Sequence, residues 1–257
     1  MLKVEAPGGA RDILLHACCA PCSGAILECL RDSGIRPVVF FSNSNIYPRA
    51  EYDLRLAELQ RYAGKMGVEL VADEYDHDAW LAAVRGLERE PERGERCAVC
   101  FRFRLTRAAC FAAQRGLPVL ATTLASSRWK DLDQVNEAGE AVCAIATSFR
   151  GSQPLKTSGC FPAGAGIQVG RTVAARGLVN GGDPLRSSGG DERSEVMPTC
   201  NTSPKVSAMA VQWWPQNWRK GGLQERRNEV IREQGFYNQN WCGCEFSRHD
   251  NPQIIQV

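Results

Sequence analysis

Short apolar runs alternate with longer amphipathic segments through the first 147 residues, and this alternation restricts the fold more than any other feature. The runs are short and apolar enough to be buried strands, and they cover residues 13–18, 37–41, 68–71 and 118–123. Helical periodicity predicts helices over residues 21–33, 49–66, 76–87, 97–114 and 131–145. Strands that alternate with helices across short connections indicate right-handed β-α-β units. We therefore predict an α/β domain with a parallel sheet flanked by helices, in which the loops after Cys18, Phe41 and Thr123 lie at the carboxyl edge where ligands bind.

The character of the chain changes between residues 148 and 210. Ten glycines lie between Gly151 and Gly190, with scattered prolines and no sustained period. Such a segment can bury little apolar surface to offset the entropy of ordering it, so we predict a long, irregular and flexible insertion. The predicted organisation is an α/β domain over 1–147, the insertion over 148–210, and a segment over 211–257 that completes the domain with a helix over 223–234 and a cysteine-containing tail.

Composition restricts the compartment and the class of chemistry. No apolar run approaches the roughly 18 residues of a membrane span, and residues 1–11 lack the pattern of a secretory signal. We therefore expect a cytoplasmic protein, in which thiols stay reduced. Twelve cysteines among 257 residues then indicate metal or redox chemistry instead of a disulfide scaffold.

Basic residues form two clusters although the net charge is only +2. The clusters contain Arg93, Arg96, Arg102, Arg104 and Arg107, and then Arg219, Lys220, Arg226 and Arg227. Aromatic residues interleave with both, which suits contact with a nucleic-acid backbone together with base stacking. A solvated surface is the alternative interpretation. The candidate contacts to a nucleic-acid backbone are Arg102, Arg104, Arg219 and Lys220.

Three thiols crowd the junction between the first predicted strand and the first predicted helix. Cys18 ends the strand, Cys19 follows it, and Cys22 lies one turn past the junction. Together with the pair Cys97 and Cys100, whose spacing is used for both zinc and iron–sulfur sites, Cys18 and Cys19 supply four thiolates. A [4Fe–4S] cluster is the favoured interpretation and structural zinc the alternative. Cys22 is left open as a further ligand or a neighbour of the ligands.

A second kind of cysteine pair lies near the C-terminus. Cys242 and Cys244 flank one glycine, and such a pair can close a small, strained and reducible disulfide that stores two electrons. His16 is predicted to be packed or hydrogen-bonded and not a ligand. Cys29, Cys110 and Cys143 lie inside helical patterns and are predicted to be core residues, whereas Cys160 and Cys200 in the insertion are assigned nothing.

Six motifs, in order along the chain, resemble those of epoxyqueuosine reductases of the QueH type. They are His16-Ala-Cys-Cys-Ala-Pro-Cys22, Asn45-Ile-Tyr-Pro-Arg-Ala-Glu-Tyr52, Glu95-Arg-Cys-Ala-Val-Cys-Phe-Arg-Phe-Arg-Leu105, Thr122-Thr-Leu124 with Ser126 and Lys130, Trp218-Arg-Lys-Gly-Gly-Leu223, and Phe236-Tyr-Asn-Gln-Asn-Trp-Cys-Gly-Cys-Glu-Phe-Ser247. The resemblance covers most of residues 11–147 and 213–249. Members of the family lack residues 148–210 and have a shorter connection there, with a strand before the Trp218 motif.

The resemblance implies a fold, a reaction and a set of site residues. The fold is adenine-nucleotide-hydrolase-like (HUP-like), and the reaction removes the epoxide oxygen from epoxyqueuosine at the tRNA wobble position, the last step of queuosine synthesis. By the same resemblance, Cys18, Cys19, Cys97 and Cys100 match the [4Fe–4S] ligands, and Cys242 and Cys244 match a redox-active disulfide. An additional iron is also implied, whereas cobalamin is not used.

Reduction of an epoxide to an alkene and water takes two electrons and two protons. A cluster passes one electron at a time and a dithiol supplies two, so we expect the two centres to act together, with an external electron donor. One alternative is an iron–sulfur tRNA thiolation enzyme, which would need a Ser-Gly-Gly-x-Asp-Ser loop where this chain has His-Ala-Cys-Cys. A non-catalytic, zinc-stapled RNA-binding module is the other alternative. Neither the donor nor the oligomeric state is predicted.

Overall fold

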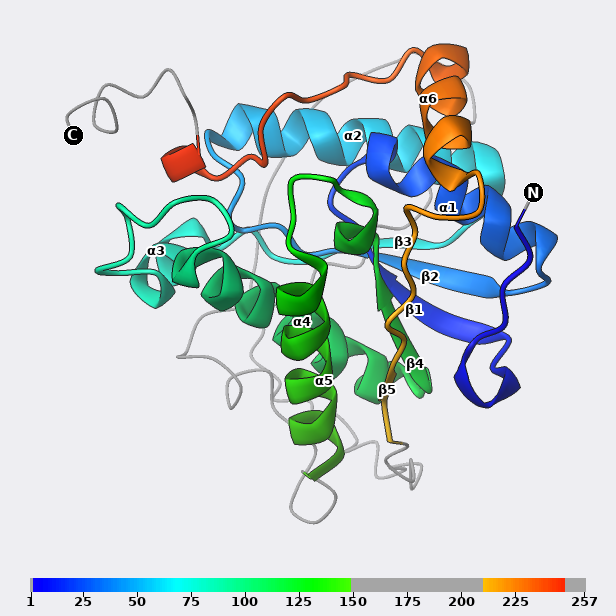
Figure 1. Cartoon of the computed structure of the whole chain (residues 1–257), viewed down its shortest axis with the longest axis horizontal. Coiled ribbons are helices and arrows are strands. Elements are labelled where there is room, and N and C mark those ends of the chain that lie inside the picture. Colours follow the sequence, from blue (N-terminus) through cyan, green and yellow to red (C-terminus); the bar gives the residue numbers. More distant parts are fainter. Residues whose placement is uncertain (1, 149–209, 248–257) are drawn as a thin grey trace, which may run out of the picture.

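A parallel sheet of five strands forms the centre of the computed structural model, which describes residues 2–148 and 210–247 (Figure 1). The strand order is β3-β2-β1-β4-β5, and every neighbouring pair is parallel. The strands are β1 (Asp12–His16), β2 (Arg36–Phe41), β3 (Leu70–Ala72), β4 (Val119–Thr122) and β5 (Gln212–Trp213). The predicted α/β class with a parallel, helix-flanked sheet of the HUP-like kind is confirmed.

Helices cover both faces of this sheet and create two apolar cores. Helices α1, α2 and α6 pack on one face, and α4 and α5 pack on the other, with α3 against α4. The helices are α1 (Ala20–Asp32), α2 (Arg49–Met66), α3 (His77–Ala83), α4 (Glu95–Arg115), α5 (Leu132–Ser148) and α6 (Leu223–Gln234). Short 3-10 turns are η1 (Pro7–Gly9), η2 (Thr123–Ser126) and η4 (Glu245–Ser247). No helix among the described residues is long and apolar enough to cross a membrane.

Local sequence signals explain where several elements begin and end. Helices α2 and α6 have the predicted bounds, and the residue after each is a glycine in the left-handed region, Gly67 (φ 67°) and Gly235 (φ 61°). Helix α3 is shorter than predicted, although Asp76 caps it by accepting a hydrogen bond from Ala79 N. The first strand ends at His16, two residues earlier than predicted, because the chain leaves the sheet to place Cys19 at the N-cap of α1.

The fifth strand comes directly after the segment outside the described residues. It pairs with β4 through Leu120 and Trp213, so the strand that the resemblance implied before the Trp218 motif is present. The Trp213 ring lies against Gly139 of α5, where a Cβ would come within 2.3 Å of it. The predicted insertion lies outside the described residues apart from its two end residues, and the division at 148 and 210 stays a prediction.

The topology identifies one edge of the sheet as the place for a ligand. From the central strand β1 the chain passes outward to β2 and β3, whereas β4 and β5 lie on the other side of β1. The connections therefore reverse direction between β1 and β4. In open parallel sheets, ligands bind beyond the carboxyl ends of the strands at such a switch point.

Candidate thiol site at the carboxyl edge of the sheet

Buried hydrogen bonds of His16 join the carboxyl ends of three strands. Its Nε2 lies 3.1 Å from the carbonyl oxygen of Ser42, and its Nδ1 lies 2.7 Å from Thr122 Oγ1. Because a carbonyl can only accept, Nε2 carries the proton and Nδ1 accepts from the Thr122 hydroxyl. Burial, and then the positive charge of Arg104, lowers the pKa of His16 to about 3, so the ring is neutral. The prediction of a packed, hydrogen-bonded His16 is confirmed.

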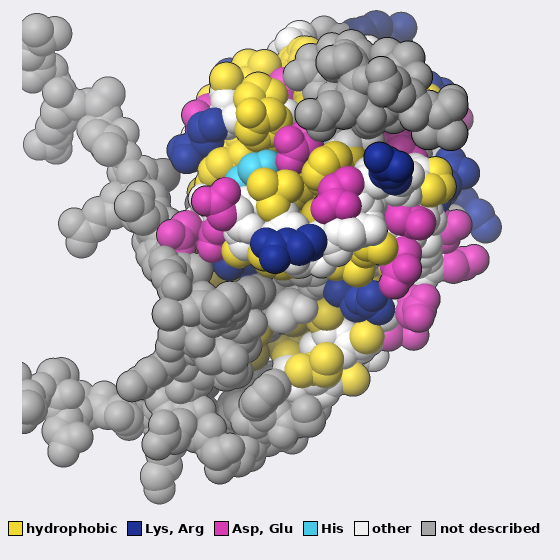
Figure 2. All heavy atoms as spheres, turned by 90° about the vertical axis from the view of Figure 1, so that its left-hand side faces the viewer, with side chains coloured by type: hydrophobic (Ala, Val, Ile, Leu, Met, Phe, Trp, Pro, Cys, Tyr) yellow, Lys and Arg dark blue, Asp and Glu magenta, His cyan; other side chains and the backbone are white. Residues whose placement is uncertain are grey.

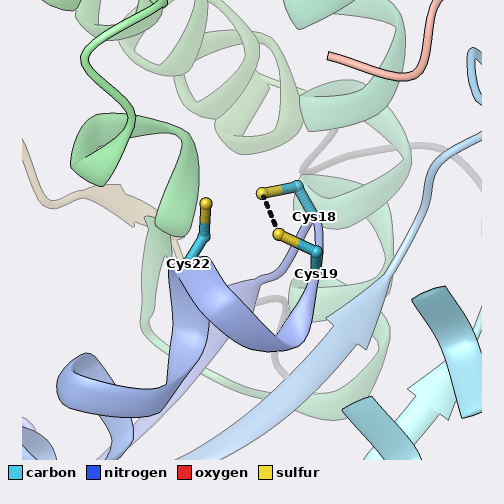
Figure 3. A group of neighbouring side chains, drawn as sticks. All are labelled: Cys18, Cys19 and Cys22. Atoms are coloured by element: carbon cyan, nitrogen blue, oxygen red, sulfur yellow. Dashed lines mark hydrogen bonds between the residues drawn. The ribbon is translucent and has the colours of Figure 1, made fainter. Parts of the chain in front are cut away.

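Three thiols meet directly beyond this bridge, and we call them the junction thiols: Cys18, Cys19 and Cys22. Their sulfurs all lie within 4.8 Å of one another, and those of Cys18 and Cys19 are 3.7 Å apart (Figure 3). The backbone N–H of Cys18 donates to Thr123 Oγ1 (3.2 Å), which fixes the loop after β1 to the loop after β4. The structure therefore groups Cys22, which the sequence left open, with the two predicted ligands.

The junction thiols differ in acidity. Hydrogen bonds from Cys19, and next from Cys22, hold the pKa of Cys18 well below its usual range. The hydrogen bond between Cys19 and Cys18 raises the pKa of Cys19. A separate hydrogen bond between Cys22 and Cys18 raises the pKa of Cys22 to about 11. Cys18 is therefore the junction thiol that ionises first. Thiolates are the ligands that zinc and iron–sulfur clusters prefer, so this group of donors suits either.

Four other cysteines line one small pocket, which we call the dithiol pocket. Cys97 and Cys100 come from the first two turns of α4, and Cys242 and Cys244 come from the tail after α6. The other lining residues are Asn45, Trp80, Arg96, Phe101, Arg104, Lys130 and Ser247. The tail pair and the CxxC pair thus share a cavity although they are far apart in sequence.

Backbone contacts fasten the tail pair to the loop before α2. Tyr47 N–H donates to the carbonyl oxygen of Gly243 (2.9 Å), and Ile46 pairs with Cys244 in an antiparallel bridge. Gly243 has φ +99°, and a Cβ there would lie 2.9 Å from Ile46, so both conformation and space require glycine. Arg55 of α2 donates to the carbonyl oxygen of Cys242 (3.2 Å). Both cysteines of this pair are free thiols in the structure.

The tail thiols are also electrostatically unequal. Hydrogen bonding from Cys244 lowers the pKa of Cys242 well below its usual range, and the positive charge of Lys130 lowers it further. The Cys242 sulfur also lies 2.9 Å from the Ser247 hydroxyl oxygen. Hydrogen bonding to Cys242, followed by burial, raises the pKa of Cys244. Cys242 is therefore the thiolate of the pair and Cys244 the thiol.

The four predicted cluster ligands fall into two groups. Cys18 and Cys19 belong to the junction thiols, whereas Cys97 and Cys100 line the dithiol pocket. Arg104 connects the groups, because it lines the pocket and its charge also lowers the pKa of Cys18. The assignment of these four cysteines as [4Fe–4S] ligands, and of the tail pair as a redox-active disulfide, remains a prediction.

The structure corrects the interpretation of the first basic cluster. Arg96, Arg104 and Arg107 are buried, so they are neither a solvated face nor contacts to a tRNA backbone. Arg104 donates to the Ser42 carbonyl (3.2 Å) and to the Asn43 side chain. The prediction that Arg104 contacts tRNA is wrong because these loop oxygens already hold its guanidinium in the interior.

The remaining cysteines follow the prediction in part. Cys29 and Cys143 are buried core residues as predicted, whereas Cys110 is only partly buried. Cys160 and Cys200 lie outside the described residues.

Sequence reasoning missed the polar residues that complete the dithiol pocket. Asn45 and Lys130 belong to quoted motifs but received no role, although Asn45 ends a polar loop beyond a strand, which is a usable signal. Trp80 lies in a segment predicted only as a helix, and nothing in the sequence marked it. Only the fold brings the three together.

Fold and site together define a class: α/β proteins with cysteines gathered at the carboxyl edge of a parallel sheet. A family model described as "Epoxyqueuosine reductase QueH" matches residues 13–158 and 190–250. The match includes both ends of the predicted insertion, so the expectation that the family lacks all of residues 148–210 is wrong, and only residues 159–189 of the insertion fall outside the match. The chain belongs to this epoxyqueuosine reductase QueH family.

Curated relatives named epoxyqueuosine reductase QueH are similar over nearly the whole chain. The protein of Histophilus somni (strain 129Pt) is 32% identical over 96% of this chain and 76% of its own length. That of Haemophilus influenzae is 31% identical over 97% of this chain and 76% of its own length. That of Acinetobacter baylyi is 31% identical over 97% of this chain and 86% of its own length.

Proposed function

We propose that this chain reduces epoxyqueuosine in the wobble position of tRNA to queuosine, the final step of queuosine biosynthesis. Membership of the QueH family supports the reaction class. The observation that carries the proposal is the pair Cys242 and Cys244, a dithiol with one acidic thiol that faces a pocket shared with Cys97 and Cys100.

This pair satisfies the stoichiometry of the reaction. Removal of one epoxide oxygen requires two electrons and two protons. Oxidation of the Cys242 thiolate and the Cys244 thiol to a disulfide releases both electrons and one proton. Solvent supplies the second proton, so the epoxide becomes an alkene and the oxygen leaves as water. An external electron donor must then reduce the disulfide before the next turnover.

The donor set also fits an iron–sulfur cluster. We propose that Cys18, Cys19, Cys97 and Cys100 hold a [4Fe–4S] cluster, because Cys18 and Cys19 have sulfurs 3.7 Å apart and all four side chains are free thiols at one edge of the sheet. When bound, such a cluster supplies one-electron transfer, and iron supplies a Lewis acid. The Cys22 sulfur lies within 4.8 Å of those of Cys18 and Cys19, which is close enough for Cys22 to bind an additional iron, but we assign it no ligand role.

The macromolecular substrate is tRNA carrying epoxyqueuosine. The cytoplasm is the proposed compartment, because that environment keeps the dithiol and the cluster ligands reduced.

Nucleoside mass spectrometry tests the proposal. Anaerobically purified protein with bound iron is incubated with epoxyqueuosine-containing tRNA and a reductant, without cobalamin, and we expect the modified nucleoside to lose one oxygen atom. Cys242→Ser should abolish multiple turnover, and Cys110→Ser, a change outside both thiol groups, should not. Full multiple turnover by Cys242→Ser would contradict the dithiol's role.

The same preparation separates the alternatives. Zinc in place of iron, with no visible absorption and no nucleoside change, would indicate a zinc-stapled RNA-binding module. A new sulfur-containing nucleoside would indicate tRNA thiolation.

A further inference from the structure

The dithiol pocket has room for one small group in addition to its side chains. Its volume is about 10 Å³, which is close to the space that a single water-sized group occupies. It is enclosed by α3, the first turns of α4, the polar loop after β2 and the tail that carries Cys242 and Cys244.

Two buried polar atoms of this pocket have no hydrogen-bond partner among the described residues. They are Oδ1 of Asn45 and the indole Nε1–H of Trp80. Asn45 is 2% exposed and Trp80 is 0% exposed. Buried polar groups are costly unless they are paired, so each unpaired atom needs an explanation. One is an acceptor and the other is a donor, and both belong to residues that line the same cavity.

Oxygen is the element that fits between these groups. An oxygen atom can accept hydrogen bonds from the Trp80 indole and from the Lys130 ammonium group, which is a third lining group and a donor only. Once protonated, the same oxygen can donate to Asn45 Oδ1. An apolar group would leave both buried atoms unpaired.

We propose that the dithiol pocket binds the oxygen that is removed from the substrate, with Trp80 and Lys130 as its donors and Asn45 as its acceptor. The inference rests on the proposed function and names the residues that act on its reacting atom. The two C–O bonds of the epoxide break while a C=C bond forms, and the Cys242 thiolate and the Cys244 thiol form an S–S bond as Cys244 loses its S–H proton. The two electrons go to the substrate carbons, and the oxygen takes one proton from Cys244 and a second from solvent.

Recognition strengthens as this reaction proceeds. The epoxide oxygen is a weak acceptor and carries no hydrogen, so it cannot donate to Asn45. As its C–O bonds break it gains negative charge and then hydrogen, which strengthens its hydrogen bonds to Trp80 and Lys130 and creates the one to Asn45. Interactions that are stronger in the transition state than in the bound substrate raise kcat and leave KM nearly unchanged.

Trp80→Phe is the sharpest test, because it removes the N–H and keeps an aromatic ring to stack on His77 and Phe246. We expect kcat for epoxyqueuosine reduction to fall on the order of 10²-fold, with KM changed less than about 3-fold. The matched control is Trp129→Phe, because Trp129 is exposed and does not line the pocket, and its kinetics should equal those of the wild type.

Affinity for product tRNA provides a second readout that does not depend on turnover. Queuosine lacks the removed oxygen but keeps the hydroxyls of its ring. Trp80→Phe should therefore bind queuosine-containing tRNA as tightly as the wild type. A matching loss of affinity for product and substrate would overturn the inference, since it would show that the pocket recognises a hydroxyl that the reaction retains.

Lys130 provides an independent variant in case Trp80→Phe does not fold. Lys130→Met should lower kcat at unchanged product affinity, and Lys130→Gln, which restores an N–H donor, should recover part of it. Unchanged kcat in both Trp80→Phe and Lys130→Met, with an active wild type, would overturn this inference alone. Failure of the wild-type protein to reduce epoxyqueuosine would overturn the proposed function and this inference with it.

Discussion

Cys242 and Cys244 are separated by a single glycine, yet their surroundings divide their chemistry. Cys242 receives hydrogen bonds from the Cys244 thiol and from the backbone N–H of Cys244, and it lies in the field of Lys130. Cys244 is buried, and its thiol donates a hydrogen bond to the Cys242 sulfur. A thiolate attacks and a neutral thiol does not, so Cys242 is the residue that should exchange with an external reductant.

This asymmetry predicts selective alkylation. A lowered pKa means that the thiolate persists to lower pH, so metal-free reduced protein should react with iodoacetamide at Cys242 with a midpoint below about 8.5, the ordinary value for a cysteine. Cys244, whose pKa is raised, should react only at higher pH. Peptide mass spectrometry after timed alkylation at several pH values measures both.

Lys130→Met should move the Cys242 midpoint to higher pH, because the variant removes a positive charge that stabilises the thiolate. Lys220→Met, at an exposed position, is the control and should leave the midpoint unchanged. Equal midpoints for Cys242 and Cys244 would contradict the assignment of thiolate and thiol.

Residue-level prediction succeeded for apolar environments and failed for buried charge. Cys29 and Cys143 were recognised as core residues because they lie among apolar neighbours with helical spacing. Arg96, Arg104 and Arg107 are eight and three residues apart, which also places them on one face of a helix, but an arginine is normally exposed. Their burial depends on loop carbonyls and on Asp73, which pairs with Arg107, and the sequence does not show that these groups lie opposite α4.

At the scale of elements, the contact of β5 with α5 closes one side of the sheet. The Trp213 ring occupies the space beside Gly139, and its indole N–H donates to Asn136 Oδ1 (3.3 Å) on the same helix. The strand has only two residues, Gln212 and Trp213, so this side-chain contact must supply much of what holds it on β4.

Gly139→Ala should therefore destabilise the protein by about 1–3 kcal/mol, the usual cost of an overpacked core. The added Cβ would lie 2.3 Å from the Trp213 ring, so strand or helix must shift. Gly64→Ala is the matched control on α2, where a Cβ meets nothing within 4 Å, and it should stabilise by roughly 0.5–1 kcal/mol. Urea unfolding measures both, and an equal effect of the two substitutions would show that β5 does not pack as described.

Elements with strong periodic patterns were predicted well, and those fixed by tertiary contact were not. Helices α2 and α6 combine amphipathic spacing with a terminal glycine, and their bounds were predicted. Strand β5 is too short to give a hydrophobic pattern, and only the family resemblance indicated it. The hydrogen bond from the Tyr47 N–H to the Gly243 carbonyl joins segments about two hundred residues apart in sequence, so no local sequence signal predicts it.

At the scale of the whole molecule, the parallel topology assembles the site. The site is built from three distant segments, which carry the junction thiols, the CxxC pair and the tail dithiol. All three segments meet at the carboxyl ends of β1, β2 and β4. The sequence predicted that these loops share an edge because parallel strands impose it. It did not predict which thiols lie within 4.8 Å, because that depends on the turn that places Cys22 beside Cys18 and Cys19.

The charge distribution of the whole molecule indicates how tRNA binding should depend on salt. The net charge is +2, and on the face in Figure 2 the Lys and Arg side chains of the described residues lie among Asp and Glu side chains. Of the predicted tRNA contacts, Arg102 and Lys220 are exposed, whereas Arg219 is partly buried and donates to the backbone carbonyl of Lys130 (2.7 Å). Arg102 and Lys220 are therefore the candidates that can reach a phosphate without leaving an internal partner.

Arg102→Ala and Lys220→Ala should each weaken tRNA binding and reduce the slope of log K against log[salt] by about 1, because each removes one phosphate contact and its counterion release. Arg104→Ala, on the same helix as Arg102, should leave the slope unchanged and lower the free energy of unfolding, because its guanidinium holds the loop after β2. Filter binding across a salt series and urea unfolding on the same variants provide the two measurements. A reduced slope for Arg104→Ala, or an unchanged slope for both exposed variants, would place the tRNA surface elsewhere. The three variants thus distinguish Arg104, which supports the site from the interior, from Arg102 and Lys220, which are expected to contact RNA at the surface.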